Sequence, residues 1–125
     1  SCLMEQLYNL KESCMRKIVA YKNYFLEFYQ IQNAKVQEKI EWTLALIRDL
    51  PVIPEKFFKH LEGTDGLFEI RVQVGSNIYR IFCFFDEGQL VVLGNAFQKK
   101  TQQTPKQELE KAEKIKKAYF DEKES

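Results

Sequence analysis

Two arginines and a lysine are the residues of this sequence with the clearest capacity for chemistry. They stand among apolar residues in the stretch 66–100, which reads GLFEIRVQVGSNIYRIFCFFDEGQLVVLGNAFQKK and contains Arg71, Arg80 and Lys99. A guanidinium presents a planar fork of donors that matches the oxygens of a phosphate, and an ammonium adds a compact positive charge. Such cations can bind an anion or stabilise negative charge that develops on a reacting phosphate.

The strands of this stretch decide whether the cations meet. Apolar and polar residues alternate from 67 to 74, which predicts a half-buried strand. Gly75-Ser76 suits a two-residue turn into the next strand, because glycine accepts a positive φ at the first central position. In this register Arg71 lies directly opposite Arg80.

A second tight turn is predicted at Glu87-Gly88, with Asp86 opposite Gln89. The turn sets three further pairs: Phe82 with Leu93, Arg80 with Asn95, and Ile78 with Phe97. The apolar side chains then form the core face of the sheet: Phe68, Ile70, Val72, Tyr79, Ile81, Cys83, Phe85, Val92 and Ala96. The opposite face collects Glu69, Arg71, Gln73, Arg80, Asn95, Phe97 and Lys99. A slip of one residue in either turn would scatter this set.

Two interpretations of the polar face stay open from the residues alone. Like charges directly opposite one another destabilise a sheet, so Arg71 and Arg80 need a counter-charge. Glu69 supplies part of it if the face is simply solvated. A bound anion is the other source, with Phe97 as a surface on which a base can stack and Phe82 deeper in the core.

The flanking segments predict the elements that hold this sheet. An apolar run predicts a first strand, and apolar residues at helical spacing predict the helices. The expected elements are a strand over 18–21, a helix capped by Asn23, a helix capped by Asn33 that ends at Leu50-Pro51, a brief helix from Pro54 to Leu61, and a final helix from Thr104-Pro105 that frays over 121–125.

Composition bounds the class of protein. A chain of 125 residues suits one domain, and a net charge of +1 means that any basic site is local. Three cysteines without a C-x-x-C pair fit a reducing cytoplasm. Neither a secretory signal nor an apolar run of about 20 residues is visible, so we expect no membrane span. We divide the chain into an extension over 1–14, native or foreign, a domain over 15–122 and a frayed tail over 123–125.

Several kinds of catalytic centre lack their residues. The sequence has no glycine-rich phosphate loop, no G-x-S-x-G and no metal-ligand cluster, so neither a metal nor a cofactor is expected. His60 is the single histidine, and it is either structural or a proton carrier. Arginine and lysine without a metal suit cleavage of a phosphodiester by its own 2′-OH, because the protein then orients the RNA, neutralises charge and manages protons.

The order of these motifs resembles the RelE/HigB superfamily of type II toxin–antitoxin systems, above all its phage-derived HigB-like branch. The likeness covers about 15–122 and rests on EIRVQVGSNIYRIFCFFDEGQLVVLGNAFQKKTQQTP and the lysine-rich helix that follows. It implies an α+β fold: a RelE-like single domain in which an N-terminal helical hairpin and a C-terminal helix pack on an antiparallel sheet of three to four strands. It also implies a cognate helix-turn-helix (HigA-like) antitoxin as partner.

The resemblance assigns roles to the cations. Arg71 matches a basic residue on the first meander strand, Arg80 matches an arginine that contacts the scissile phosphate, and Lys99 matches a residue that stabilises the transition state. Further contacts with the RNA are expected from Lys100, Phe97, Asn95 and Lys106. These expectations agree with the face that the turn register predicts.

The proton carrier is less clear in this sequence. Several members of the family carry a tyrosine or histidine near the C-terminal tail, whereas this tail reads DEKES and Tyr119 lies in an apolar stripe. His60, a lysine of depressed pKa, or the ribosome itself would have to serve.

The leading hypothesis is a cytoplasmic, ribosome-dependent mRNA endonuclease that acts in the ribosomal A site without metal. Its products would carry a 2′,3′-cyclic phosphate and a 5′-OH. The alternatives are a ParE-like toxin that inhibits DNA gyrase and an inactive relative that retains only antitoxin binding. The clustered cations favour the endonuclease, since a gyrase inhibitor has no need of a phosphate-sized basic site.

Overall fold

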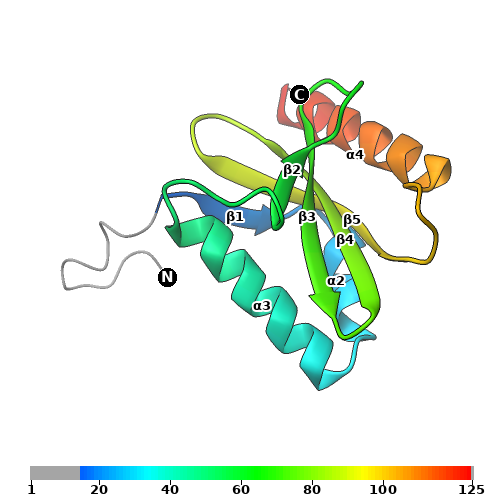
Figure 1. Ribbon diagram of the computed structural model, residues 1–125. Helices are drawn as coiled ribbons and strands as arrows, with labels where there is room; N and C mark the ends of the chain where they lie inside the picture. The colour runs from blue at the N-terminus through cyan, green and yellow to red at the C-terminus, as the bar shows by residue number, and fades with distance from the viewer. Residues whose placement is uncertain (1–14, 125) are drawn as a thin grey trace.

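The structure is a computed structural model that describes residues 15–124, so the extension expected over 1–14 lies outside the described residues. Within that range a five-stranded sheet of order β1-β5-β4-β3-β2 is flanked by three helices (Figure 1). The elements are β1 (Lys17–Ala20), α2 (Tyr24–Gln30), α3 (Ala34–Asp49), β2 (Phe58–His60), β3 (Leu67–Val74), β4 (Asn77–Phe85), β5 (Leu90–Lys99) and α4 (Lys106–Glu124).

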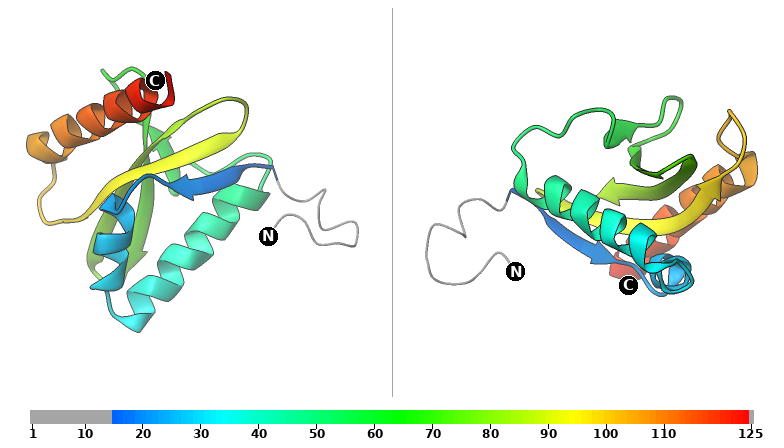
Figure 2. Two further views of the ribbon diagram at one scale, coloured as in Figure 1. Left: turned by 180° about the vertical axis from the view of Figure 1, so that it is seen from behind. Right: turned by 60° about the horizontal axis from the view of Figure 1, so that its bottom comes forward.

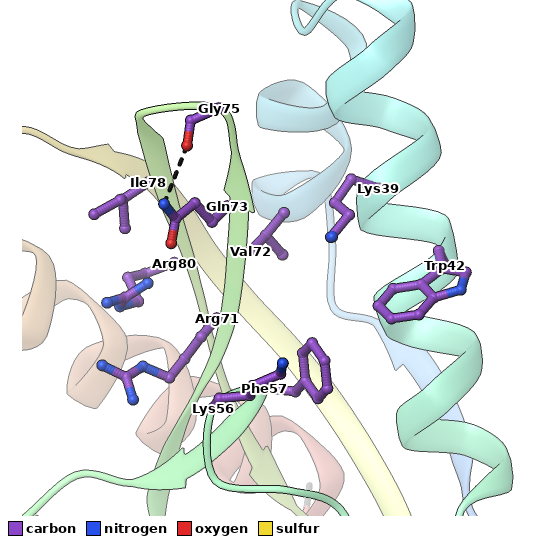
Figure 3. Close-up of a pocket in the computed structure, with 10 residues that line it drawn as sticks. All are labelled: Lys39, Trp42, Lys56, Phe57, Arg71, Val72, Gln73, Gly75, Ile78 and Arg80. Atoms are coloured by element: carbon purple, nitrogen blue, oxygen red, sulfur yellow. Dashed lines mark hydrogen bonds between the residues drawn. The ribbon is translucent and has the colours of Figure 1, made fainter.

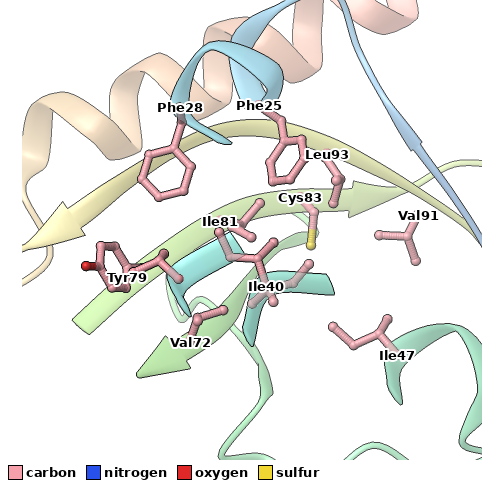
Figure 4. Close-up of a cluster of buried hydrophobic side chains, with 12 residues drawn as sticks. Phe25, Phe28, Ile40, Ile47, Val72, Tyr79, Ile81, Cys83, Val91 and Leu93 are labelled. Carbon is pink, nitrogen blue, oxygen red and sulfur yellow. The ribbon is translucent and has the colours of Figure 1, made fainter. Parts of the chain in front are cut away.

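Helices cover both faces of the sheet (Figure 2). On one face, Phe25 and Phe28 of α2 and Ile40 of α3 pack on strand residues such as Ile81 in a buried apolar cluster (Figure 4). On the other face, α4 packs on a second cluster, whose buried members are Leu67, Phe82, Phe84, Val92, Phe97, Ala112 and Ile115. We call the face under the helical hairpin of α2 and α3 the hairpin face, and the face under α4 the α4 face. The β3–β4 hairpin extends beyond α4, which leaves part of the α4 face open (Figure 1).

The first predicted turn is confirmed. Arg71 lies opposite Arg80, and Gly75 has a φ of +61°, which favours glycine. The cap of α3 is also confirmed, because the Asn33 side chain accepts a hydrogen bond from the Val36 backbone N–H at 3.0 Å. The prediction that the Asn23 side chain caps α2 is wrong: Asn23 stands at the N-cap position, but its side chain makes no capping hydrogen bond.

The predicted pairing of β4 with β5 is wrong. The Asp86 N–H donates to the carbonyl of Leu90, so the turn is longer than expected. Further along, two residues of β5, Gly94 and Asn95, stand opposite the single residue Phe82 in a β-bulge. The observed pairs are Arg80 with Phe97, Ile78 with Lys99, and Cys83 with Leu93.

The turn and the bulge each displace β5 by one residue, with different consequences along the strand. Between them the side chains change face, so Val92 packs under α4 and not on the predicted core face. Beyond the bulge the two displacements together restore the predicted faces. Phe97 and Lys99 therefore still share a face with Arg80.

The sheet is larger than the three to four antiparallel strands expected. It has five strands and is mixed, because β1 pairs with β5 in parallel. The brief helix predicted from Pro54 to Leu61 is wrong, since this segment supplies β2. Tertiary packing overrides the local signal: the Phe58 ring stacks on the Phe68 ring at 4.9 Å, and the carbonyl of Phe57 accepts from the Arg71 N–H at 2.8 Å.

The C-terminal helix is held at its last turn by a carboxylate. Asp86, in the β4–β5 turn, accepts a hydrogen bond from the Tyr119 hydroxyl at 2.6 Å and from Lys123 Nζ at 2.8 Å. The bond from Lys123 lies within the range 121–125 where fraying was expected, and α4 remains helical to Glu124. Hydrogen bonds from Lys123 and then from Tyr119 lower the pKa of Asp86 below its ordinary value of 3.8.

The buried aromatic under α4 gives a test of the fold. Phe82 is fully buried and packs edge-on against Phe97, with ring centroids 5.1 Å apart. We expect Phe82→Ala to lower the free energy of unfolding by about 3–5 kcal/mol in urea denaturation, because it leaves a cavity. Ile31→Ala is the control: Ile31 is 80% exposed, so its truncation should change stability by less than about 0.5 kcal/mol.

The anchor of α4 gives a test by pH. Since the pKa of Asp86 is lower in the folded than in the unfolded chain, its stabilisation is present above the unfolded pKa and is lost as pH falls through the folded pKa. Asp86→Asn should be less stable than wild type at pH 7, and its stability should fall less on acidification below about pH 4. Equal acid dependence in both proteins would contradict this; Glu110→Gln, at an exposed position of α4, is the control.

Candidate functional site

The open part of the α4 face holds a buried carboxylate between two arginines. Glu69 Oε2 lies 3.3 Å from Arg71 Nε, and Glu69 Oε1 lies 3.4 Å from Arg80 Nε. The side chains of Glu69 and Arg80 are each 7% exposed, whereas that of Arg71 is 31% exposed. Each carboxylate oxygen thus faces one guanidinium, which explains how two arginines stand opposite one another in a sheet.

Glu69 does not neutralise the charge of the two arginines. Arg80 Nη1 donates to the carbonyl of Tyr79 at 3.2 Å, but Arg80 Nε and Glu69 Oε1 make no hydrogen bond within residues 15–124. Two guanidiniums share one carboxylate, so the group keeps a net positive charge. An anion that approaches Arg71 and Arg80 therefore meets a net positive charge.

Lys99 joins this group from β5. It lies opposite Ile78, on the same face as Arg80, and is half-buried. Burial lowers the pKa of Lys99, and the positive charge of Arg80 lowers it further. Burial likewise lowers the pKa of Arg80, against the raising effect of Glu69, yet a guanidinium remains charged at neutral pH.

A hollow of about 540 Å³ opens beside the arginines (Figure 3). It lies between α3, the segment before β2, and the outer part of the β3–β4 hairpin. Its lining contains four cations and no carboxylate: Lys39, Lys56, Arg71 and Arg80. The remaining lining residues are Trp42, Phe57, Val72, Gln73, Gly75 and Ile78. We call this space the basic hollow.

The structure brings together only some of the residues predicted for the site. Arg71, Arg80 and Lys99 share one face, as expected. Lys100 and Lys106 are exposed at the two ends of the segment that joins β5 to α4. Phe97 shares the face but is 9% exposed and belongs to the cluster under α4, so its ring is mostly covered.

Two other predicted residues have different surroundings. Asn95 is 2% exposed and its amide donates to the backbone carbonyl and to Oε1 of Glu108, both at 3.0 Å, so it ties the bulge to α4. His60 pairs with Phe68 in the sheet, and its ring meets the Phe68 ring edge-on at 5.2 Å on the hairpin face. It therefore points away from Arg71 and Arg80.

Sequence reasoning missed the residues on the far side of the basic hollow. Trp42 and Lys39 come from α3, while Lys56 and Phe57 come from the segment for which a helix was predicted. One signal was available: Trp42 lies outside the apolar stripe of its helix and is 49% exposed. Tryptophan is among the residue types enriched at binding interfaces, so an exposed tryptophan is a candidate contact residue.

A family profile described as "Phage derived protein Gp49-like (DUF891)" matches residues 27–117, which is most of the chain. The chain belongs to this Gp49-like family. No curated protein sequence matches it. The matched range contains the two arginines, Glu69, Lys99 and all residues that line the basic hollow.

The fold of this Gp49-like chain is RelE-like. It is similar to a chain in the crystal structure of the archaeal RelE–RelB complex from Pyrococcus horikoshii OT3, with a TM-score of 0.50 and 19% sequence identity. The similarity covers 66% of this chain and 92% of the archaeal one.

Residues 15–124 contain no group of three or more histidine, cysteine, aspartate and glutamate side chains that could hold a metal ion. No helix in that range is long and apolar enough to cross a bilayer.

The buried carboxylate can be tested through stability. Glu69→Gln leaves Arg71 and Arg80 face to face without their counter-charge, so we expect the free energy of unfolding to fall by about 3–5 kcal/mol. Inorganic phosphate can replace the lost charge and should therefore raise the melting temperature more in the variant than in wild type. Thermal unfolding over a phosphate titration measures both. Glu110→Gln, on the exposed side of α4, should match wild type; an identical phosphate response in all three proteins would contradict the anion site.

Proposed function

We propose that this protein is the toxin of a type II toxin–antitoxin system, of the HigB-like branch, and that it cleaves mRNA in the A site of the ribosome. The observation that carries the proposal is the cluster of Arg71, Arg80 and Lys99 around a single buried carboxylate. Membership of a phage-derived family and the RelE-like fold support it. The partner would be a helix-turn-helix antitoxin, HigA-like, and the site of action the cytoplasm.

The cations suit a cleavage in which RNA supplies its own nucleophile. The 2′-OH attacks the adjacent phosphorus and the 5′-oxygen leaves, which yields a 2′,3′-cyclic phosphate and a 5′-OH. Negative charge grows on the phosphate oxygens during this step. Arg71 and Arg80 would bind those oxygens, and their fixed position in a sheet means that little reorganisation is needed as the charge develops.

The reaction needs one group to accept the proton of the 2′-OH and one to protonate the leaving oxygen. Lys99 suits the second task, because a lysine of lowered pKa gives up its proton more readily at neutral pH. His60 suits neither task, because it lies on the hairpin face. Tyr119 is engaged by Asp86 at the far end of α4. We therefore assign protonation of the leaving 5′-oxygen to Lys99. A group of the ribosome would accept the proton of the 2′-OH.

The proposal is tested with translating ribosomes, a defined mRNA and mapping of the cleaved ends. We expect cleavage at defined positions of the mRNA, with ends that carry a 2′,3′-cyclic phosphate and a 5′-OH. Intact mRNA together with inhibition of DNA gyrase would overturn the proposal in favour of a ParE-like toxin. Intact mRNA together with tight antitoxin binding would overturn it in favour of an inactive relative.

Substitution of the arginines measures their part in the reaction. Arg71→Ala and Arg80→Ala should each lower the cleavage rate by about 10²–10³-fold, because each removes a donor from the developing charge. Arg80→Lys keeps the charge but loses the planar fork, so it should also be impaired. Lys114→Ala, at an exposed position of α4, is the matched loss of a cation and should cleave as wild type does. Melting temperatures of all variants identify those that are merely unfolded.

A further inference from the structure

We propose that Trp42 and Phe57 form a stacking subsite for one unpaired base of a single-stranded RNA, next to the phosphate bound by Arg71 and Arg80. The inference rests on the proposed function, because it extends the same site along the RNA. It assigns the basic hollow to a nucleotide that neighbours the scissile phosphate (Figure 3).

Trp42 is not accounted for by packing of the core. The residues of α3 that face the sheet, such as Ile40 and Ile47, are fully buried, whereas Trp42 is 49% exposed and belongs to neither apolar cluster. Its ring meets Phe57 edge-on, with centroids 5.6 Å apart at 74°. The pair forms an aromatic corner, and both of its residues line the basic hollow (Figure 3).

The short strand β2 creates the space beside this corner. Its pairing with β3 ends at Phe58 and Ile70, followed by one bond between Phe57 and Arg71. Within residues 15–124 no strand pairs with this side of β3 from Val72 to Val74. The gap between that edge and α3 is the basic hollow, whose volume of about 540 Å³ lies in the range of small-molecule sites.

Cations border the aromatic corner on both sides. Lys39 Nζ lies 4.9 Å from the centroid of the Trp42 ring, and Lys56 Nζ lies 5.1 Å from that of Phe57. With Arg71 and Arg80 they form a cationic border without a carboxylate in the lining. Alternation of aromatic faces with cations is the arrangement by which proteins hold single-stranded nucleic acid, because bases stack while phosphates are neutralised.

Stacking predicts how selective the subsite is for the base that it binds. Every base has a π-face, so stacking adds affinity with little preference for sequence. The subsite would therefore position the RNA on Arg71 and Arg80 and would not define the codon that is cut. The expected signature is a change in KM with a smaller change in kcat.

Trp42 is the single tryptophan of the chain, so its fluorescence reports on the subsite directly. The first probe is a mixed-sequence oligomer of 2′-O-methyl ribonucleotides, which cannot be cleaved. The second is polyphosphate, which offers charge without bases. We expect saturable quenching with the oligomer. Polyphosphate should compete with the oligomer for binding but quench little.

Variants separate stacking from charge, with binding measured by anisotropy of a labelled oligomer. Trp42→Ala should weaken binding by about 5- to 150-fold, whereas Trp42→Phe should stay within a few-fold of wild type. Trp42→Leu keeps the apolar bulk and should behave like Trp42→Ala. Ile31→Ala removes an exposed apolar side chain outside the basic hollow and should bind as wild type does.

The outcomes distinguish this inference from the proposed function. Quenching and weakened binding in Trp42→Ala support the subsite even if mRNA on ribosomes stays intact, in which case only the cleavage proposal fails. If Trp42→Ala cleaves mRNA with unchanged KM and binds the oligomer with unchanged affinity, the stacking subsite is overturned and the proposed nuclease activity is supported. Loss of antitoxin binding alone in Trp42→Ala also overturns it, because the corner would then be a protein interface.

Discussion

One buried carboxylate makes the cationic face of this protein possible. Two arginines placed directly opposite one another in a sheet repel, and desolvation of Arg80 adds to the cost. Glu69 offsets both effects by giving one oxygen to each guanidinium. Because the single negative charge of Glu69 is shared by two positive charges, the face keeps a net positive charge. Glu69 thus stabilises the paired arginines in the sheet and still leaves the net positive charge that the proposed cleavage requires.

The rest of the architecture keeps that face rigid and accessible. α2 and α3 bury the hairpin face, and α4 buries only part of the other, so the arginines stand on a firm sheet that is open on one side. Asp86 fixes the end of α4, and Asn95 fixes its start. Rigid support of this kind favours a site that stabilises charge by position.

Local signals in the sequence were enough for the part of the site that lies on neighbouring strands. A two-residue turn at Gly75-Ser76 has few alternatives, so it fixed the register of Arg71 and Arg80. The second turn was mistaken because a longer loop and a bulge fit the same residues. Gly94 inside the strand was the available sign of that bulge.

Features that depend on distant segments were beyond local reasoning. β2 forms because Phe58 finds Phe68 across the sheet, not because its own residues demand a strand. The basic hollow is assembled from α3, from the segment before β2, and from the edge of β3. Nothing in the sequence around Trp42 says that Phe57 lies beside it. The positions of His60 and Asn95 likewise follow from sheet pairing and from α4, which residue type alone does not reveal.

The bulge in β5 has a consequence for how the length of this strand can vary in evolution. Two residues of β5 stand opposite Phe82, so loss of one residue at Gly94 or Asn95 would remove the bulge and leave Ala96 opposite Ile81 and Lys99 opposite Ile78. Side chains of a strand alternate between faces, so loss of one residue between the bulge and Lys99 would instead turn Lys99 toward the hairpin face without altering any residue around Glu69. A single deletion is therefore expected to be tolerated at the bulge, whereas a relative with one beyond the bulge would keep its arginines yet lack the lysine beside them.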